Sequence, residues 1–176
     1  MTIAQFVNMS TEQAAHFMAG KDIQPVRKRL AEIVGKHRVI DIGCGPGFEI
    51  KELFDPHTYF GIDCSRELVL IARQRNPGFA FASIDALSVE GHWDFAIVKA
   101  VLEHLPEADA LAIYDHARSI SDTLLVAWHT EPSMQPEYAT YQGELGQMQQ
   151  NRHNLRAFAG NIARERCGAH VIWHVT

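Results

Sequence analysis

The stretch Asp41-Ile42-Gly43-Cys44-Gly45-Pro46-Gly47 follows a short β-branched apolar run and places three glycines in the alternation G-x-G-x-G. The apolar run predicts a buried strand, and the residues after Gly47 predict a short helix. Glycine allows a tight turn and allows a ligand to lie against the main chain, where a Cβ atom would collide. The stretch therefore predicts a ligand-binding turn between a strand and a helix, with a plain tight turn as the alternative.

The same residues disfavour two phosphate-binding loops. The dinucleotide fingerprint G-x-G-x-x-G needs a third glycine at the position of Phe48, and it offers helix N–H groups to a pyrophosphate. Pro46 has no N–H group to donate. The G-K-[ST] of a P-loop is missing. A nicotinamide-dependent oxidoreductase is therefore disfavoured.

Short apolar runs alternate with helical periodicity along the rest of the chain. Strands are predicted at residues 39–42, 59–63, 79–85, 95–98, 124–128 and 171–175. Helices are predicted at residues 22–35, 48–54, from Ser65 to the breaker at 76–78, around 110–117, and from Leu155 through Phe158, Ala159, Ile162 and Ala163 to a stop at Gly168. This order predicts an α/β fold, namely a doubly wound, mainly parallel sheet of six or seven strands with an N-terminal helical segment.

In such sheets a ligand binds outside the carboxyl ends of the strands, where the strand order reverses. Chemistry-bearing residues follow the predicted strands at these ends. In chain order they are residues 41–47, Asp63, Asp85, residues 99–104 and His129. We therefore expect one site at this edge.

With these motifs the sequence resembles the class I S-adenosylmethionine-dependent methyltransferases of the small single-domain type, whose first motif is acidic-x-G-x-G-x-G. Asp41, Gly43, Gly45 and Gly47 match that motif completely, and the order of elements agrees from about residue 22 to residue 175. The resemblance implies S-adenosylmethionine as methyl donor and cofactor.

The resemblance also implies roles for individual residues. Asp63, 22 residues after Asp41, stands where the family has an acid that accepts hydrogen bonds from both ribose hydroxyls. Asp85 looks like the residue that receives the adenine amino group, and residues 95–106 resemble the motif that borders methyl transfer. The implied donor set is Asp41, Gly43, Cys44, Gly45, Gly47, Asp63, Cys64, Ile84, Asp85, Ala86 and Lys99, the last through its backbone. The alternatives are that Asp63 caps the following helix and that Asp85 closes a turn.

Two histidines could act as general base, a group needed only if the acceptor loses a proton as it reacts. They are His104, in the stretch Leu-Glu-His-Leu, and His129, after the fifth strand. The alternative is that His104 shapes the pocket, as this stretch does in family members with differing acceptors.

No repeat or linker divides the chain, so residues 1–176 are expected to form one domain. Its expected parts are the N-terminal helical segment 1–36, the donor-binding core 37–129, a candidate lid 130–154, and a last helix and strand at 155–176. The alternative for 130–154 is a surface connection or a short extra helix. Because the chain stops after one final strand, an open apolar edge at residues 171–173 leaves homodimerisation open.

Composition narrows the setting and the partners. A net charge of −5 makes nucleic acid an unlikely partner, and the basic residues between Lys21 and Arg38 are expected to form a solvated helix face. Three cysteines without C-x-x-C spacing predict neither disulfides nor a metal site. With no leader or membrane segment evident, we expect a soluble cytoplasmic protein.

The expected acceptor is a small molecule, or a sugar or natural-product intermediate. Methylation of RNA or protein stays open as an alternative, with the basic N-terminal cluster as docking surface. A second alternative is a donor-binding subunit that is inactive without a partner chain. No residue pattern identifies the acceptor atom.

Overall fold

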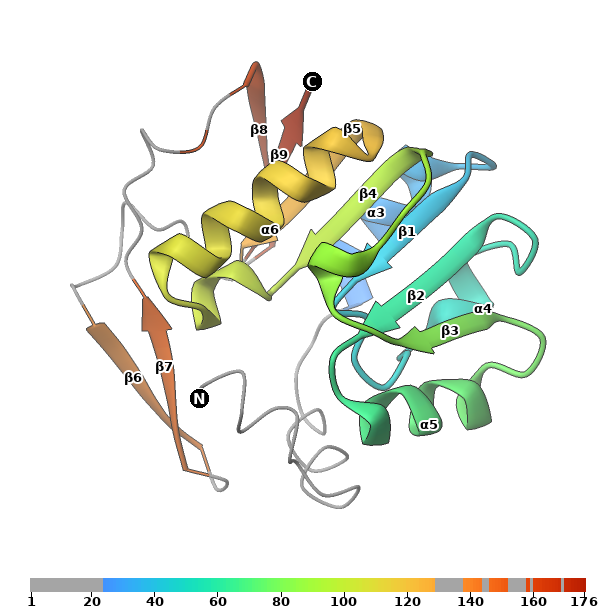
Figure 1. Cartoon of the computed structure of the whole chain (residues 1–176), viewed down its shortest axis with the longest axis horizontal. Helices are drawn as coiled ribbons and strands as arrows, with labels where there is room; N and C mark the ends of the chain where they lie inside the picture. Colours follow the sequence, from blue (N-terminus) through green and yellow to red (C-terminus); the bar gives the residue numbers. More distant parts are fainter. Residues whose placement is uncertain (1–23, 129–137, 144–145, 152–157, 159, 169) are drawn as a thin grey trace.

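The structure, a computed structural model, describes residues 24–128, 138–143, 146–151, 158, 160–168 and 170–176. A seven-stranded sheet with the order β3-β2-β1-β4-β5-β9-β8 forms the centre of the molecule (Figure 1). Five strands are parallel: β1 (Val39–Ile42), β2 (Tyr59–Asp63), β3 (Ala80–Ser83), β4 (Trp93–Lys99) and β5 (Ser121–Trp128). β8 (Ile162–Cys167) and β9 (His170–Val175) are antiparallel. The prediction of a doubly wound, mainly parallel sheet is confirmed.

Helices cover both faces of this sheet. α3 (Gln24–Val34), α4 (Ile50–Leu53) and α5 (Arg66–Arg75) pack on one face, and α6 (Glu107–Ser119) packs on the other (Figure 1). The first face buries Val26, Leu30 and Val34 of α3, which are spaced along one stripe of that helix. Two 3₁₀ turns, η1 (Ala86–Ser88) and η2 (Leu102–His104), follow β3 and β4.

The strand order reverses between β1 and β4. β1 pairs with β2 on one side and with β4 on the other, both in parallel. The carboxyl ends of these three strands therefore meet at one edge of the sheet, where a crevice forms in doubly wound folds.

The predicted last helix is wrong over residues 162–167, which form strand β8; residues 155–157 and 159 lie outside the described part of the chain. Gly168, with a φ of 59°, ends a hairpin strand here. The physical reason is the backbone of β9, whose N–H and C=O groups need partners on both sides. β8 supplies the second partner within the same chain.

The prediction of an open edge at residues 171–173 is therefore also wrong. Val171, Ile172 and Trp173 pair with β5 on one side and with β8 on the other. The sheet has seven strands without a second subunit, and this edge supplies no argument for homodimerisation.

Part of the candidate lid forms a separate two-stranded antiparallel sheet. β6 (Tyr138–Gly143) pairs with β7 (Gly146–Asn151), and β7 lies beside η2, which follows the carboxyl end of β4. These residues form a hairpin and not the short extra helix that was the alternative.

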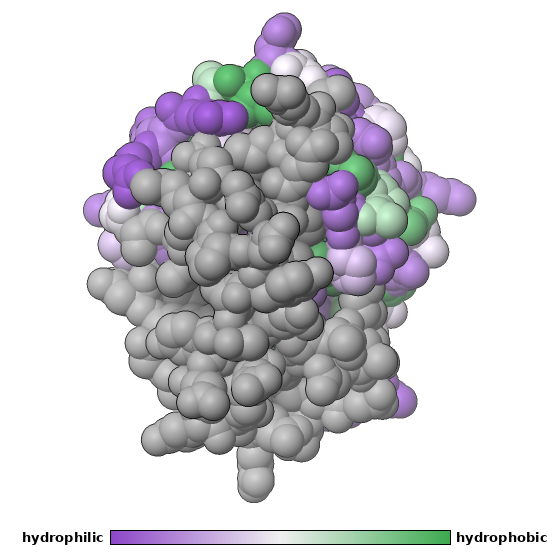
Figure 2. Space-filling model, turned by 90° about the vertical axis from the view of Figure 1, so that its left-hand side faces the viewer, coloured by the Kyte–Doolittle hydropathy of each residue, from purple (hydrophilic) through white to green (hydrophobic). Residues whose placement is uncertain are grey.

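The described residues visible on the side of the molecule in Figure 2 are mainly hydrophilic, with small hydrophobic patches between them. Within the described ranges, the large apolar side chains exposed to solvent are Leu70 and Leu87. None of the helices in these ranges has the length and apolar character needed to cross a membrane. No group of three His, Cys, Asp or Glu side chains in the same ranges is placed to hold a metal ion.

Candidate functional site

The glycine turn after β1 is fixed by backbone hydrogen bonds to the neighbouring strand. The N–H groups of Gly43 and Cys44 both donate to the carbonyl of Ile62, at 2.8 and 2.9 Å, and Gly47 N donates to the carbonyl of Cys44 at 3.3 Å. We call residues 43–47 the glycine loop. Its start is anchored to the end of β2, so the two strand ends and the loop form one unit.

The three glycines have φ values of 75°, 57° and 63°, a backbone region that favours glycine. A Cβ atom at Gly43 would lie 2.3 Å from Val101 Cγ2, and one at Gly47 would lie 2.7 Å from Asn76 Nδ2. A Cβ at Gly45 would meet no atom of the described residues within 4 Å. The space beside the two outer glycines is therefore filled by the side chains of Val101 and Asn76. The space beside the central glycine is open as far as the described residues go, so a ligand can lie there.

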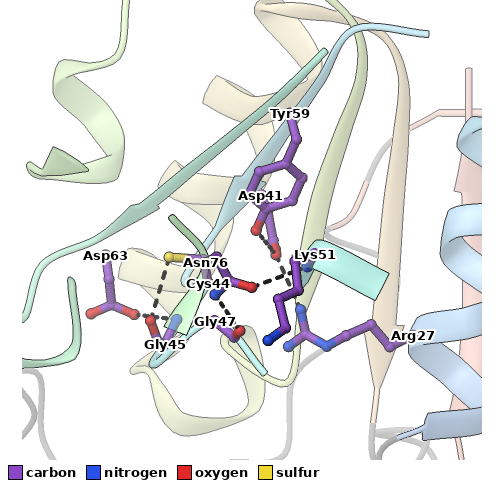
Figure 3. Close-up of polar contacts among 9 residues, drawn as sticks. All are labelled: Arg27, Asp41, Cys44, Gly45, Gly47, Lys51, Tyr59, Asp63 and Asn76. Carbon is purple, nitrogen blue, oxygen red and sulfur yellow. Dashed lines mark hydrogen bonds and ion pairs between the residues drawn. The ribbon is translucent and has the colours of Figure 1, made fainter. Parts of the chain in front are cut away.

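Asp63 connects β2 to this loop (Figure 3). Its carboxylate is buried; Oδ2 accepts a hydrogen bond from Gly45 N at 3.0 Å, and Oδ1 accepts one from Ser65 N at 2.9 Å. Ser65 itself caps α5, because its side chain accepts from Leu68 N. Burial raises the pKa of Asp63, and the two N–H donors oppose that rise. Asp63 thus supports the start of α5 and also contacts the glycine loop.

Asp41 has different partners. Its Oδ2 accepts a hydrogen bond from the Tyr59 hydroxyl at 2.7 Å and pairs with Arg27 Nη1 at 3.4 Å, all three side chains being buried (Figure 3). Burial, and secondly the charge of Asp41, raise the pKa of Tyr59 well above its usual range. The Asp41 carboxylate therefore lies within an internal ion pair on the α3 face of the sheet.

Arg27 belongs to the basic cluster that the sequence suggested is solvated. Only 4% of its surface is exposed, and Arg27 Nε has no hydrogen-bond partner among the described residues. The expectation of a solvated helix face is therefore wrong at this position. The buried guanidinium neutralises the buried carboxylate of Asp41, which would otherwise be a costly unpaired charge.

The carboxyl end of β3 lies against that of β2. Ser83 pairs with Asp63 in the sheet register, and Ile84 N donates to the Asp63 carbonyl at 3.2 Å. Asp85 is exposed, and its Oδ1 accepts from Leu87 N at 2.9 Å, so it caps η1. The surface of Cys64 is likewise exposed as a whole, but partial burial of its thiol and secondly the charge of Asp63 raise the pKa of the thiol to about 11. Asp63, Cys64, Ile84, Asp85 and the following Ala86 thus stand at adjoining strand ends, as predicted.

The carboxyl end of β4 borders the loop from the other side. Ile42 pairs with Val98, which places Lys99 and the residues after it beside the glycine loop. Ala100 adopts a φ of 53° and Val101 packs onto Gly43. Lys99 and His104 are both buried, the latter within η2. His129 lies outside the described residues.

Three contributors to the site were missed at the sequence level. The sequence pattern indicates Asn76 only as part of a helix breaker, Tyr59 only as a strand residue, and Arg27 only as a member of a basic cluster, whereas the structure places all three in contact with the loop or with Asp41. The available signal for Arg27 is its spacing. Val26 and Leu30 lie on the buried stripe of α3, and Arg27 adjoins that stripe.

The glycine loop and the Asp63 carboxylate together form a cradle that fits a ligand carrying hydroxyl groups. Asp63 is an acceptor-only group when ionised and has lone pairs beyond those that bind Gly45 and Ser65. It stands next to Gly45, the loop glycine whose added Cβ would meet none of the described atoms within 4 Å. A hydroxyl-bearing ligand at Gly45 could therefore also reach this carboxylate.

The fold and this loop together define a doubly wound α/β protein with a candidate ligand site at the β1 and β2 strand ends. The chain belongs to the methyltransferase domain family, whose sequence model matches residues 14–157.

Comparison with curated proteins finds trans-aconitate 2-methyltransferases. The one from Methylobacterium nodulans is 32% identical over 112 residues, which cover 58% of this chain and 43% of the relative. The matched regions of the three curated relatives span only 36–43% of their lengths.

Comparison with solved structures finds the same fold at low identity. An amino pentose methyltransferase from Micromonospora echinaspora with bound SAM matches with a TM-score of 0.69 at 14% identity, over 95% of this chain and 97% of that one. The SAH-bound magnesium protoporphyrin IX methyltransferase from Synechocystis matches with a TM-score of 0.62 at 17% identity, over 86% and 82% of the two chains.

Proposed function

We propose that this protein is an S-adenosylmethionine-dependent methyltransferase that acts on a small molecule. The observation that carries the proposal is the hydrogen bond from Gly45 N to Asp63 Oδ2, which joins the glycine loop and the acid of the second strand in one cradle. Membership in the methyltransferase domain family supports the reaction class.

The contacts to the methyl donor would come from the ends of several strands. Gly43, Gly45 and Gly47 shape the loop against which the donor would lie. Asp63 would accept hydrogen bonds from the two ribose hydroxyls of the donor. Asp85 receives the adenine amino group, and the base is flanked by apolar or small neighbours. The remaining members of the proposed donor set are Cys44, Cys64, Ile84, Ala86 and Lys99. Asp41, the acid of the motif, supports the start of the loop from within the fold, since its carboxylate is bound by Arg27 and Tyr59.

When bound, S-adenosylmethionine supplies a methyl group on a sulfonium, whose thioether is a good leaving group. The chain's contribution is then mainly to hold the acceptor in line with that methyl group, an orientation effect that can supply several kcal/mol. His104 or His129 acts as a base only for an acceptor that must lose a proton.

The acceptor side is bounded by η2 and by the β6–β7 hairpin beside it. We propose a small carboxylic acid as the first acceptor class to test, because the curated relatives are named trans-aconitate 2-methyltransferases. Sugars and natural-product intermediates come second, since the Micromonospora protein with this fold is an amino pentose methyltransferase.

Calorimetric titration with S-adenosylhomocysteine tests donor binding. We expect binding, together with a rise in Tm at saturating ligand, because a ligand selective for the native state stabilises it. NAD is the control ligand. The proposal would be contradicted if NAD binds and S-adenosylhomocysteine does not bind even at millimolar concentration.

The acceptor is tested with methyl-labelled donor against pools of carboxylic acids, sugars, amines, phenols and RNA. We expect labelled product from a small-molecule pool. Product from RNA alone, with a steep loss of activity in salt, would favour a nucleic-acid substrate instead. Donor binding without product from any pool would favour an inactive partner subunit.

Replacing residues 138–148 by a short Gly-Ser linker tests the hairpin. If it completes the acceptor pocket, turnover is abolished while the affinity for S-adenosylhomocysteine changes by less than about threefold. Equal loss of turnover and donor affinity would show that the hairpin supports the fold or the donor instead.

A further inference from the structure

Asn76 follows α5 and reaches across to the far end of the glycine loop. Its side chain is buried, with 1% of the residue exposed. The amide nitrogen Nδ2 donates to the carbonyl of Gly47 at 2.7 Å and to that of Ala72 at 3.0 Å. Its oxygen Oδ1 accepts from Lys51 N at 3.0 Å (Figure 3). Both amide hydrogens and the amide oxygen are therefore used, and two of the three bonds go to the segment between β1 and β2.

The helix that follows the loop lacks a cap of its own. α4 has four residues, and its N-cap Glu49 adopts a left-handed φ of 60° and makes no side-chain hydrogen bond to the helix. The first N–H groups of a helix have no partner within the helix. Asn76 accepts from Lys51 N in this first turn, so it supplies from 25 residues away the cap that Glu49 does not provide.

The glycine loop is consequently held at both ends by different elements. Its first half is bound to β2 through Ile62 and Asp63. Its second half is bound to the end of α5 through the carbonyl of Gly47. A Cβ at Gly47 would come within 2.7 Å of the amide nitrogen of Asn76, so the third glycine of the motif is required by this contact.

We propose that Asn76 is a positioning residue for the methyl donor. It sets the affinity of the protein for the donor by holding the glycine loop, and it does not itself contact the donor. This inference rests on the proposed function, because the loop is the surface on which the donor lies. An asparagine suits the role because one amide both donates to the loop and accepts from the helix. Leu, Ala or Asp at this position could not make all three bonds.

Three variants test the proposal: Asn76→Ala, Asn76→Asp and, as matched control, Arg73→Ala. Arg73 lies in the last turn of α5, which Asn76 follows, and it also donates two hydrogen bonds to the backbone, but to the carbonyl of Phe81, which belongs to β3 and not to the glycine loop. The readouts are Tm, the Kd of S-adenosylhomocysteine, the split between donor KM and kcat, and hydrogen exchange in the ligand-free protein.

Asn76→Ala is expected to raise the Kd and the donor KM about tenfold with kcat little changed, since about two hydrogen bonds to the loop segment are lost. Both Asn76→Ala and Arg73→Ala are expected to lower Tm, because each loses hydrogen bonds to the backbone, but Arg73→Ala is expected to leave the Kd unchanged. For Asn76→Asp, the new carboxylate repels the Gly47 carbonyl until it takes up a proton. Its Kd relative to the unmodified protein therefore falls as the pH is lowered from 8 to 5.5.

Hydrogen exchange separates this inference from the proposed function. In ligand-free Asn76→Ala, the Lys51 amide is expected to exchange faster than in Arg73→Ala, because it has lost its acceptor. Equal Kd values in Asn76→Ala and Arg73→Ala, or equal exchange at Lys51, would overturn the positioning role. Absence of S-adenosylhomocysteine binding in the unmodified protein would instead contradict the donor proposal, and exchange at Lys51 would still decide whether Asn76 holds the loop segment.

Discussion

β1 and β2 are neighbours in the sheet, and each carries a buried aspartate near its carboxyl end, yet the two carboxylates have different surroundings. Asp41 is bound by the cation of Arg27 and the hydroxyl of Tyr59. Asp63 is bound by neutral groups, namely the backbone N–H groups of Gly45 and Ser65, the first of them in the glycine loop, and the Cys64 side chain. A carboxylate paired internally with a cation contributes to the fold, and one held by backbone beside open space remains available to a ligand.

The largest expected effect is on stability, at Asp41. Asp41→Ala leaves Arg27 as an uncompensated buried charge, and breaking a buried pair in this way lowers the free energy of unfolding by about 3–5 kcal/mol. Urea denaturation measures it. A fall of under about 1 kcal/mol in the free energy of unfolding would show that solvent compensates the charge of Arg27 in place of Asp41.

The double variant Arg27→Met with Asp41→Leu sharpens this result. Because it removes both charges and leaves apolar groups of similar size, its unfolding free energy should exceed that of Asp41→Ala. A double variant as unstable as the single one would point to Tyr59, which loses its acceptor in both.

The next effect is on binding, at Asp63. Asp63→Ala removes a charged acceptor from the proposed ribose hydroxyls and should weaken S-adenosylhomocysteine binding by about 1–3 kcal/mol, roughly 5- to 150-fold. Calorimetry measures the Kd. An unchanged Kd would remove Asp63 from the site.

The contrast between the two acids also marks the reach of sequence reasoning. The loop and Asp63 were predictable, because a glycine alternation after an apolar run and an acid after the next run are local patterns. The partners of Asp41 were not, because Arg27 precedes an exposed Lys28 and a partly exposed Arg29, and its place beside the buried stripe does not by itself identify Asp41 as its partner.

The C-terminal region shows the same limit. Apolar residues at helical spacing predicted a helix that included Ile162 and Ala163, yet Ile162–Cys167 is a strand. Short apolar spacings fit both periods. The deciding contact is the pairing of β8 with β9, which no local pattern contains. Asn76 was likewise unpredictable as a loop contact, since its partners lie 25 and 29 residues away.

A smaller effect is expected from pH, again at Asp63. Burial raises the pKa of Asp63 above 3.8, so its carboxylate takes up a proton at a higher pH than an exposed aspartate does. Donor affinity should fall as the pH drops through that raised pKa, and Asp63→Asn should remove the dependence. The contribution of this group to folding has the opposite sign, being greatest below the unfolded pKa and lost as the pH rises through the folded one. Calorimetry between pH 7 and pH 4 follows the binding effect.

The smallest effect on stability is expected at Glu165. Comparing it with Asp41 tests whether burial or pairing with arginine sets the contribution of Asp41 to the stability of the fold. Arg29 Nε lies 2.6 Å from Glu165 Oε1, closer than Arg27 lies to Asp41, but both side chains are a third or more exposed. The hydrogen bond from Arg29 lowers the pKa of Glu165 below 4.5. The stabilisation from this pair is therefore present above the unfolded pKa and lost as the pH falls through the folded one.

If burial decides, Glu165→Gln lowers Tm at pH 7 by no more than about 2 °C, and 0.5 M salt removes most of the difference, because exposed pairs are well screened. Asp41→Asn, measured beside it, should lower Tm by several times as much and respond little to salt. Equal shifts in the two variants would show that pairing with arginine, and not the buried position of Asp41, sets its contribution to the fold.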